Sequence, residues 1–199
     1  MILIEYAIKA IAILIVITIF EFTKALASTM QGDNRPRLDK RLTLNPLSHF
    51  EPIGFILFIF TGYGWGKPVE INTGGYNQRK RGIIITYLSP ILVSVVISIL
   101  MRLVLFIFGE AMASSQKAIL TLLQLFMYNL GLKFAAIAVF NLIPIYPMCG
   151  SWIIRTMLKP NQVIKFAQSE KIFQLIFMFL LFLGFITPML NFVVFIIFR

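Results

Sequence analysis

The chain has 199 residues, of which 59% are hydrophobic and 13% are charged. That balance excludes an ordinary soluble domain, and several long apolar runs indicate an integral membrane protein. The formal net charge is +10. No basic stretch carries stacking aromatic residues in a polar setting, so we expect basic membrane-protein loops and no nucleic-acid partner. The single cysteine, Cys149, excludes an intrachain disulfide.

The N-terminal run, residues 2–30, is predicted to be a retained transmembrane helix. Its charges, Glu5 and Lys9, replace the basic start of a signal peptide, and no small-residue cleavage site follows it. The run is long enough to cross a hydrocarbon core of about 30 Å at about 1.5 Å per residue. After the polar stretch that follows, the alternation in residues 42–46 predicts a short β-strand.

Residues 53–60 are apolar, but glycines and Pro68 follow closely, and about a dozen residues cannot cross a bilayer as a helix. We therefore predict a re-entrant hairpin, whose backbone must be covered by protein. Longer apolar runs at 82–108, 118–142 and 172–198 predict three further spans, with kinks at their prolines. The sequence thus indicates one all-α membrane domain over residues 1–199, with about four transmembrane helices.

The basic residues support the re-entrant interpretation. If residues 53–60 crossed the membrane, the stretches 31–52 and 65–81 would lie on opposite sides with four Lys or Arg each, and no charge bias would remain. If they re-enter, one side carries twelve basic residues: Arg35, Arg37, Lys40, Arg41, Lys67, Arg79, Lys80, Arg81, Arg155, Lys159, Lys165 and Lys171. The other side carries Lys117 and Arg199. We therefore expect a multi-pass protein of the cell membrane, with cytoplasmic basic loops and both termini outside.

Three segments carry a specific resemblance. They are residues 41–54, residues 62–69 and residues 141–151. The last is close to the pattern N-x-x-P-x-x-P-x-D-G. The three occur in the order and spacing of the site-2 protease signatures. The chain therefore resembles the compact bacterial branch of these intramembrane zinc proteases. The resemblance implies a core of three transmembrane helices that holds zinc within the membrane, near its cytosolic end.

The zinc motif of that family, H-E-x-x-H, is degenerate in this chain. Its two histidines lie at i and i+4, so that both reach one metal ion, and the glutamate acts as the general base. Here Phe20 and Lys24 flank Glu21, and Cys149 stands at the position of the third ligand, an aspartate. Phenylalanine cannot coordinate zinc, and a protonated lysine repels it. We therefore expect no cofactor, a vestigial general-base position at Glu21, and an ion pair between Glu21 and Lys24.

These losses favour a catalytically inactive homologue, a pseudoenzyme that binds or assembles with integral membrane proteins and contacts lipid. Two alternatives remain open at this stage. One is an active intramembrane protease with an unorthodox site at Cys149 and Glu21. The other is a small transporter or channel subunit that uses Glu21, Lys24 and Lys133 as intramembrane charge sites. His49, the only histidine, is expected to form structural hydrogen bonds.

Overall fold

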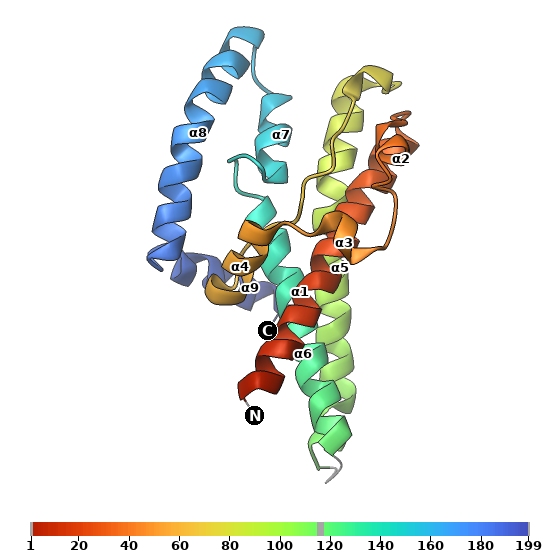
Figure 1. Cartoon of the computed structure of the whole chain (residues 1–199), viewed down its shortest axis with the longest axis vertical. Coiled ribbons are helices and arrows are strands. Elements are labelled where there is room, and N and C mark those ends of the chain that lie inside the picture. The colour runs from red at the N-terminus through yellow and green to blue at the C-terminus, as the bar shows by residue number, and fades with distance from the viewer. Residues whose placement is uncertain (1, 115–117, 199) are drawn as a thin grey trace.

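The computed structural model describes residues 2–114 and 118–198, and within these ranges the chain is helical, with no strand. Most of the length lies in a few long helices connected by short helical turns (Figure 1). The helices are α1 (Ile2–Met30), α2 (Arg35–Leu38), α3 (Pro46–His49), α4 (Pro52–Thr61), the 3-10 turn η1 (Thr73–Gly75), α5 (Arg79–Ser114), α6 (Ala118–Asn141), α7 (Cys149–Arg155), α8 (Pro160–Phe182) and α9 (Thr187–Phe198).

Three of the described helices, α1, α5 and α6, are long and apolar enough to cross a membrane. They pack against one another along much of their length (Figure 1). Their contact surface is built largely from β-branched and aromatic residues of α1 and from an almost continuous buried stretch of α6, residues 133–141. These helices fit a multi-pass membrane protein, as the apolar runs predict.

The last apolar run, residues 172–198, differs from the predicted single kinked span. It is divided between α8 and α9, whose axes differ by 80° at a break of a few residues. Gly184 lies in the break with a φ of +79°, a left-handed conformation that ends α8 and that side chains rarely adopt. Pro188 then stands in the first turn of α9, where a proline is compatible with a helix. The fourth span therefore exists only if this bent pair counts as one.

The β-strand predicted at residues 42–46 is wrong. No neighbouring strand exists within the described chain to pair with it, and the segment instead leads into α3. Asn45 caps that helix, because its side-chain oxygen accepts a hydrogen bond of 3.1 Å from the Leu47 N–H, and Pro46 begins it. The alternating pattern is therefore that of an extended connection ending in a helix cap.

The short apolar helix α4 is the first arm of a tight hairpin. The chain turns at Gly62, which caps α4, and then runs back against it. A Cβ on Gly64 would lie 2.1 Å from the carbonyl oxygen of Gly54, so this approach of the two backbones requires glycine. The chain enters and leaves α4 from the same end of the molecule (Figure 1). This is the geometry that a re-entrant element needs.

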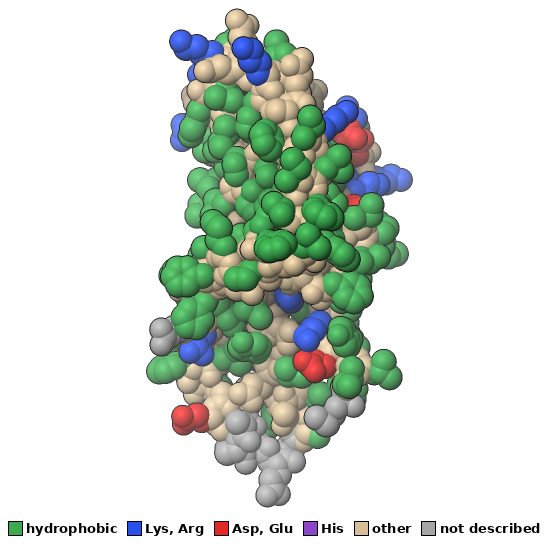
Figure 2. Space-filling view, turned by 90° about the vertical axis from the view of Figure 1, so that its left-hand side faces the viewer, with side chains coloured by type: hydrophobic (Ala, Val, Ile, Leu, Met, Phe, Trp, Pro, Cys, Tyr) green, Lys and Arg blue, Asp and Glu red, His purple; other side chains and the backbone are tan. Residues whose placement is uncertain are grey.

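The basic segments gather at one end of the molecule. The turn after α1, the connection before α5 and the connection between α7 and α8 all lie at the upper end in Figure 1. Figure 2 shows Lys and Arg side chains at this end and a broad band of hydrophobic side chains below them. Lys117 and Arg199, assigned to the opposite side, lie outside the described residues. The cytoplasmic location of the basic end stays a prediction.

Candidate functional site: a buried ion pair at the degenerate motif

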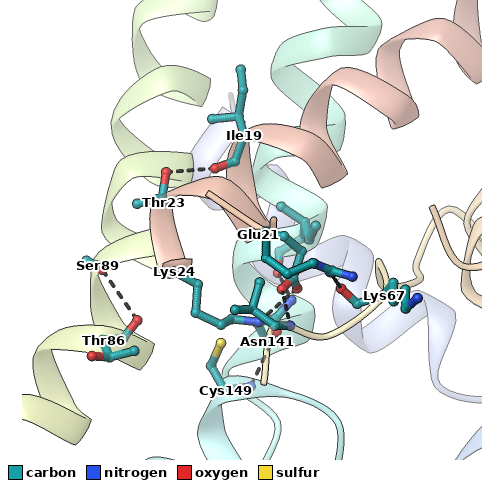
Figure 3. Close-up of polar contacts among 12 residues, drawn as sticks. Ile19, Glu21, Thr23, Lys24, Lys67, Thr86, Ser89, Asn141 and Cys149 are labelled. Atoms are coloured by element: carbon teal, nitrogen blue, oxygen red, sulfur yellow. Dashed lines mark hydrogen bonds and ion pairs between the residues drawn. The ribbon is translucent and has the colours of Figure 1, made fainter. Parts of the chain in front are cut away.

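Helix α1 and the start of α7 bring the degenerate positions together. Phe20, Glu21 and Lys24 lie on the inner face of α1, and Cys149 is the first residue of α7. All four side chains are buried. Figure 3 shows the Cys149 side chain beside that of Lys24, with Glu21 and Asn141 close by. Residues of α1 and α7 that are far apart in the sequence therefore meet at one place in the fold.

The predicted ion pair between Glu21 and Lys24 is confirmed. The Lys24 Nζ lies 2.8 Å from the Glu21 Oε1, and both side chains are almost completely buried. The second carboxylate oxygen, Oε2, accepts a hydrogen bond of 3.1 Å from the Val69 backbone N–H. Both oxygens of the glutamate are thus occupied, as a buried charge requires.

The Lys24 ammonium group has a second neighbour on its own helix. It lies 5.2 Å from the centroid of the Phe20 ring, within the range of a cation–π interaction. Phe20 and Lys24 are one helical turn apart, so their side chains meet on one face of α1. Phe20 and Lys24, which flank Glu21, therefore form one arrangement, in which the aromatic ring and the carboxylate both stabilise the ammonium.

Cys149 is held by its backbone, while its thiol stays uncharged. The Cys149 N–H donates a hydrogen bond of 3.3 Å to the side-chain oxygen of Asn141, which fixes the start of α7 against the end of α6. Burial raises the pKa of the Cys149 thiol to about 12. The reactive thiolate is consequently scarce at neutral pH, because burial disfavours the charged form.

These residues do not fit a zinc ion. The described residues contain no group of three His, Cys, Asp or Glu side chains that could hold a metal. Of the two metal-type donors at this place, Glu21 already uses both oxygens, in the ion pair and in the bond to Val69. Phe20 offers no lone pair, and the Lys24 ammonium would repel a dication. The donor set is therefore unsuited to metal chemistry.

His49 and Arg41 support the chain that covers the ion pair. The His49 Nε2 donates a hydrogen bond of 2.8 Å to the Thr43 carbonyl, and the His49 carbonyl accepts one of 2.8 Å from the Lys67 N–H. Arg41 donates to the Lys67 carbonyl. Burial lowers the pKa of His49, so the ring is neutral at pH 7. These bonds agree with the structural role predicted for His49.

Lys133 lies apart from the ion pair. Its Nζ is 5.6 Å from the centroid of the Phe58 ring and close to Gly62, at the C-terminal end of α4. Lys133 takes part in none of the ion pairs among the described residues. A cation at the end of α4 is favourably placed, since the C-terminus of a helix carries partial negative charge. Lys133 is therefore associated with the hairpin.

Sequence reasoning missed a second buried charged cluster. Glu170 on α8 is buried and accepts hydrogen bonds from Arg155 and Ser151 of α7. The Arg155 guanidinium also lies 4.8 Å from the centroid of the Trp152 ring. Arg155 and Ser151 are 15 and 19 residues from Glu170, so no i, i+3 or i, i+4 spacing indicates the cluster in the sequence. The signal that was available was the occurrence of a carboxylate inside a largely apolar helix.

A cleft of about 240 Å³ opens beside the ion pair. Lys24 lies at its wall, together with the extended segment 68–71. Aromatic side chains from three other parts of the chain, Tyr87, Tyr146 and Trp152, complete the lining. Such a mixture of apolar rings and exposed backbone is suited to holding a polypeptide segment.

Fold and site together describe an all-helical membrane-type protein with a buried glutamate–lysine pair beneath a cleft. A Bacillus subtilis (strain 168) protein described as "Putative zinc metalloprotease YwhC" is 27% identical over 186 residues, which cover 92% of this chain and 82% of the relative. This similarity supports a metalloprotease-like relationship. No protein-family model matches the chain, and no solved structure is significantly similar to it.

Proposed function

We propose that the chain is a catalytically inactive homologue of the site-2 proteases that acts by binding another integral membrane protein. The observation that carries the proposal is the buried ion pair between Lys24 and Glu21. In an active zinc protease, the glutamate must be free to take a proton from zinc-bound water. Here its carboxylate is neutralised by an adjacent ammonium and held by the Val69 N–H.

The proposed core is that of the family, with α1, α5 and α6 as the transmembrane helices and α4 as the re-entrant element. Two features support it. The chain enters and leaves α4 on the same side, as a re-entrant hairpin must (Figure 1), and the three signature segments meet around Glu21. In this proposal the scaffold is retained while the metal chemistry is lost.

Binding is the activity that such a scaffold still supports. The cleft beside Lys24 is lined by aromatic side chains, by polar groups and by an extended backbone segment, which suits a polypeptide from a partner membrane protein. The thiol alternative is disfavoured, because Cys149 is buried and burial raises its pKa to about 12. The relay alternative is disfavoured, because Lys133 lies against Phe58 and Gly62 and forms no ion pair with a carboxylate of the described residues.

Site-specific cross-linking in native membranes tests the proposal. A photoreactive residue at Tyr146, which lines the cleft and is 41% exposed, should cross-link an integral membrane protein that mass spectrometry identifies. The matched control is Phe106 on the outer surface of α5, which is 75% exposed and should give lipid adducts alone. Recovery of the Tyr146 form as a single species, without any partner, after mild detergent extraction would contradict a binding role.

A further inference from the structure

A second and larger cleft, of about 580 Å³, lies at the basic end of the molecule, between the start of α5 and the α7–α8 connection. Three basic side chains line it: Arg79 and Lys80 from α5, and Arg155 from α7. None of its described lining residues is a carboxylate. This cleft shares Trp152 with the one beside Lys24, but its other lining residues differ, and it carries three cations.

Two of the three cations are available to a ligand. Arg155 is engaged by Glu170, which lies behind the cleft wall. Arg79 and Lys80 are exposed, and no carboxylate of the described chain lies within ion-pair distance of either. They also form the first residues of α5, where the helix adds partial positive charge. The cleft therefore offers an unneutralised site for an anion.

The remainder of the cleft is apolar. Ile83 on α5 and Trp152 on α7 line it, together with Val163 and Ile164 on α8. Its lining combines the basic start of α5 with the first turns of the apolar helix α8, so it lies where a basic end joins membrane-type helices. Tryptophan is enriched at that level of membrane proteins, because its ring suits the boundary between headgroups and acyl chains. A free anion would satisfy the cations but leave this apolar wall exposed to water.

We propose that this cleft binds an anionic phospholipid. Arg79 and Lys80 contact the phosphate, and the upper part of an acyl chain lies along Ile83 and Trp152. Charge complementarity and the apolar wall both favour a lipid, because a lipid supplies the phosphate and the hydrocarbon in one molecule. The site does not depend on whether Glu21 has lost its catalytic role.

Tryptophan quenching by brominated lipid tests the proposal directly. The chain has two tryptophans, so Trp65→Phe leaves Trp152 as the only one. In phosphatidylcholine vesicles with about one lipid in ten replaced by dibrominated phosphatidylglycerol, we expect stronger quenching of Trp152 than with the same fraction of dibrominated phosphatidylcholine. Arg79→Ala with Lys80→Ala should weaken the preference for the anionic lipid about tenfold to thirtyfold. Each basic residue near an anionic membrane surface strengthens binding about fivefold, and the two contributions multiply.

The matched control removes the same charge elsewhere. Lys165→Ala with Lys171→Ala, two exposed positions of α8 outside the cleft, should leave the preference intact. Inorganic phosphate at matched ionic strength should not displace the lipid. Equal quenching by the two brominated lipids, an equal loss in the control variant, or full displacement by phosphate would each overturn the proposal. The four replaced basic side chains are exposed, and Trp65→Phe keeps an aromatic ring at its half-buried position, so the variants should fold.

Discussion

Two ion pairs with a buried carboxylate occur among the described residues, and they differ in how the chain builds them. Glu21 and Lys24 are three residues apart on α1, so a single helix forms the pair. Glu170 and Arg155 are 15 residues apart and join α8 to α7. The first pair needs only helical spacing. The second requires two helices to be correctly packed before the charges can meet.

The difference between the two pairs indicates which of them can be replaced without a change in the packing of the helices. A pair formed within one helix can replace another arrangement on that helix without moving any backbone. The Val69 N–H, which contacts the Glu21 carboxylate, can stay in place as well. The α7–α8 pair, in contrast, is part of the packing, and its loss should loosen the arrangement of those helices.

The largest effect is expected for Lys24→Met. The substitution leaves the Glu21 carboxylate buried with only the Val69 N–H to stabilise it, so the free energy of unfolding should fall by about 3–5 kcal/mol. Unfolding in mixed detergent micelles measures this. The double variant, Lys24→Met with Glu21→Gln, removes both charges and should recover to within about 1 kcal/mol of the parent. An unchanged stability of the single variant would show that Lys24 does not compensate Glu21.

A smaller effect is expected for Glu170→Ala. Arg155 would lose its carboxylate and Ser151 its acceptor. Since the Arg155 side chain is 20% exposed and water partly compensates it, a loss of about 2–3 kcal/mol is expected. The control is Glu5→Ala, which breaks an exposed pair with Lys9 and should cost less than about 1 kcal/mol. Equal effects of the two substitutions would mean that the α7–α8 pair is not a packing element.

Stability should also depend on pH through His49. Burial lowers the pKa of His49 in the folded protein below its ordinary value of 6.5, so protonation favours the unfolded chain. The contribution is therefore complete above pH 6.5 and decreases as the pH falls below it, by at most about 1.4 kcal/mol per pH unit. Thermal unfolding between about pH 7.5 and about pH 5.5, on either side of 6.5, measures how stability changes with pH. The His49→Gln variant should reduce this dependence, and an unchanged slope would exclude His49 as its source.

The smallest perturbation is chemical labelling of Cys149. Because burial covers this thiol and raises its pKa to about 12, a maleimide should react at pH 8 at least about a hundredfold more slowly with the native protein than with the denatured protein. Cys149→Ser serves as the blank. Rapid labelling of the native protein would revive the alternative in which Cys149 acts as a nucleophile.

Sequence patterns predicted the parts of the fold that depend on long runs of apolar residues. The bounds of α1 follow from a long, mostly apolar stretch that ends at the polar turn residues 31–34, and α6 begins where its apolar run begins. The 80° break between α8 and α9 was only partly predictable. Gly184 and Pro188 mark its position, but its angle depends on packing. The false strand at residues 42–46 shows that alternation alone cannot supply a pairing partner.

In the site, too, contacts within one helix were predictable from the sequence, while contacts between helices were not. The Glu21–Lys24 pair was predictable because its partners are one helical turn apart. The convergence of Cys149 with that pair followed from the resemblance of three separated segments, since spacing alone cannot join α1 to α7. Glu170 and Arg155 could not be paired in advance, because only the folded connection between α7 and α8 brings them together.

Zinc binding by the purified chain distinguishes a lost metal site from a working one. We expect that the chain, measured by plasma mass spectrometry after equilibration with zinc and gel filtration, carries well below about 0.1 zinc per chain, and that Cys149→Ser does not change this. The triple variant Phe20→His, Lys24→His, Cys149→Asp restores the three ligand types at these positions and should approach about one zinc per chain. About one zinc per unaltered chain, lost on Cys149→Ser, would contradict the account.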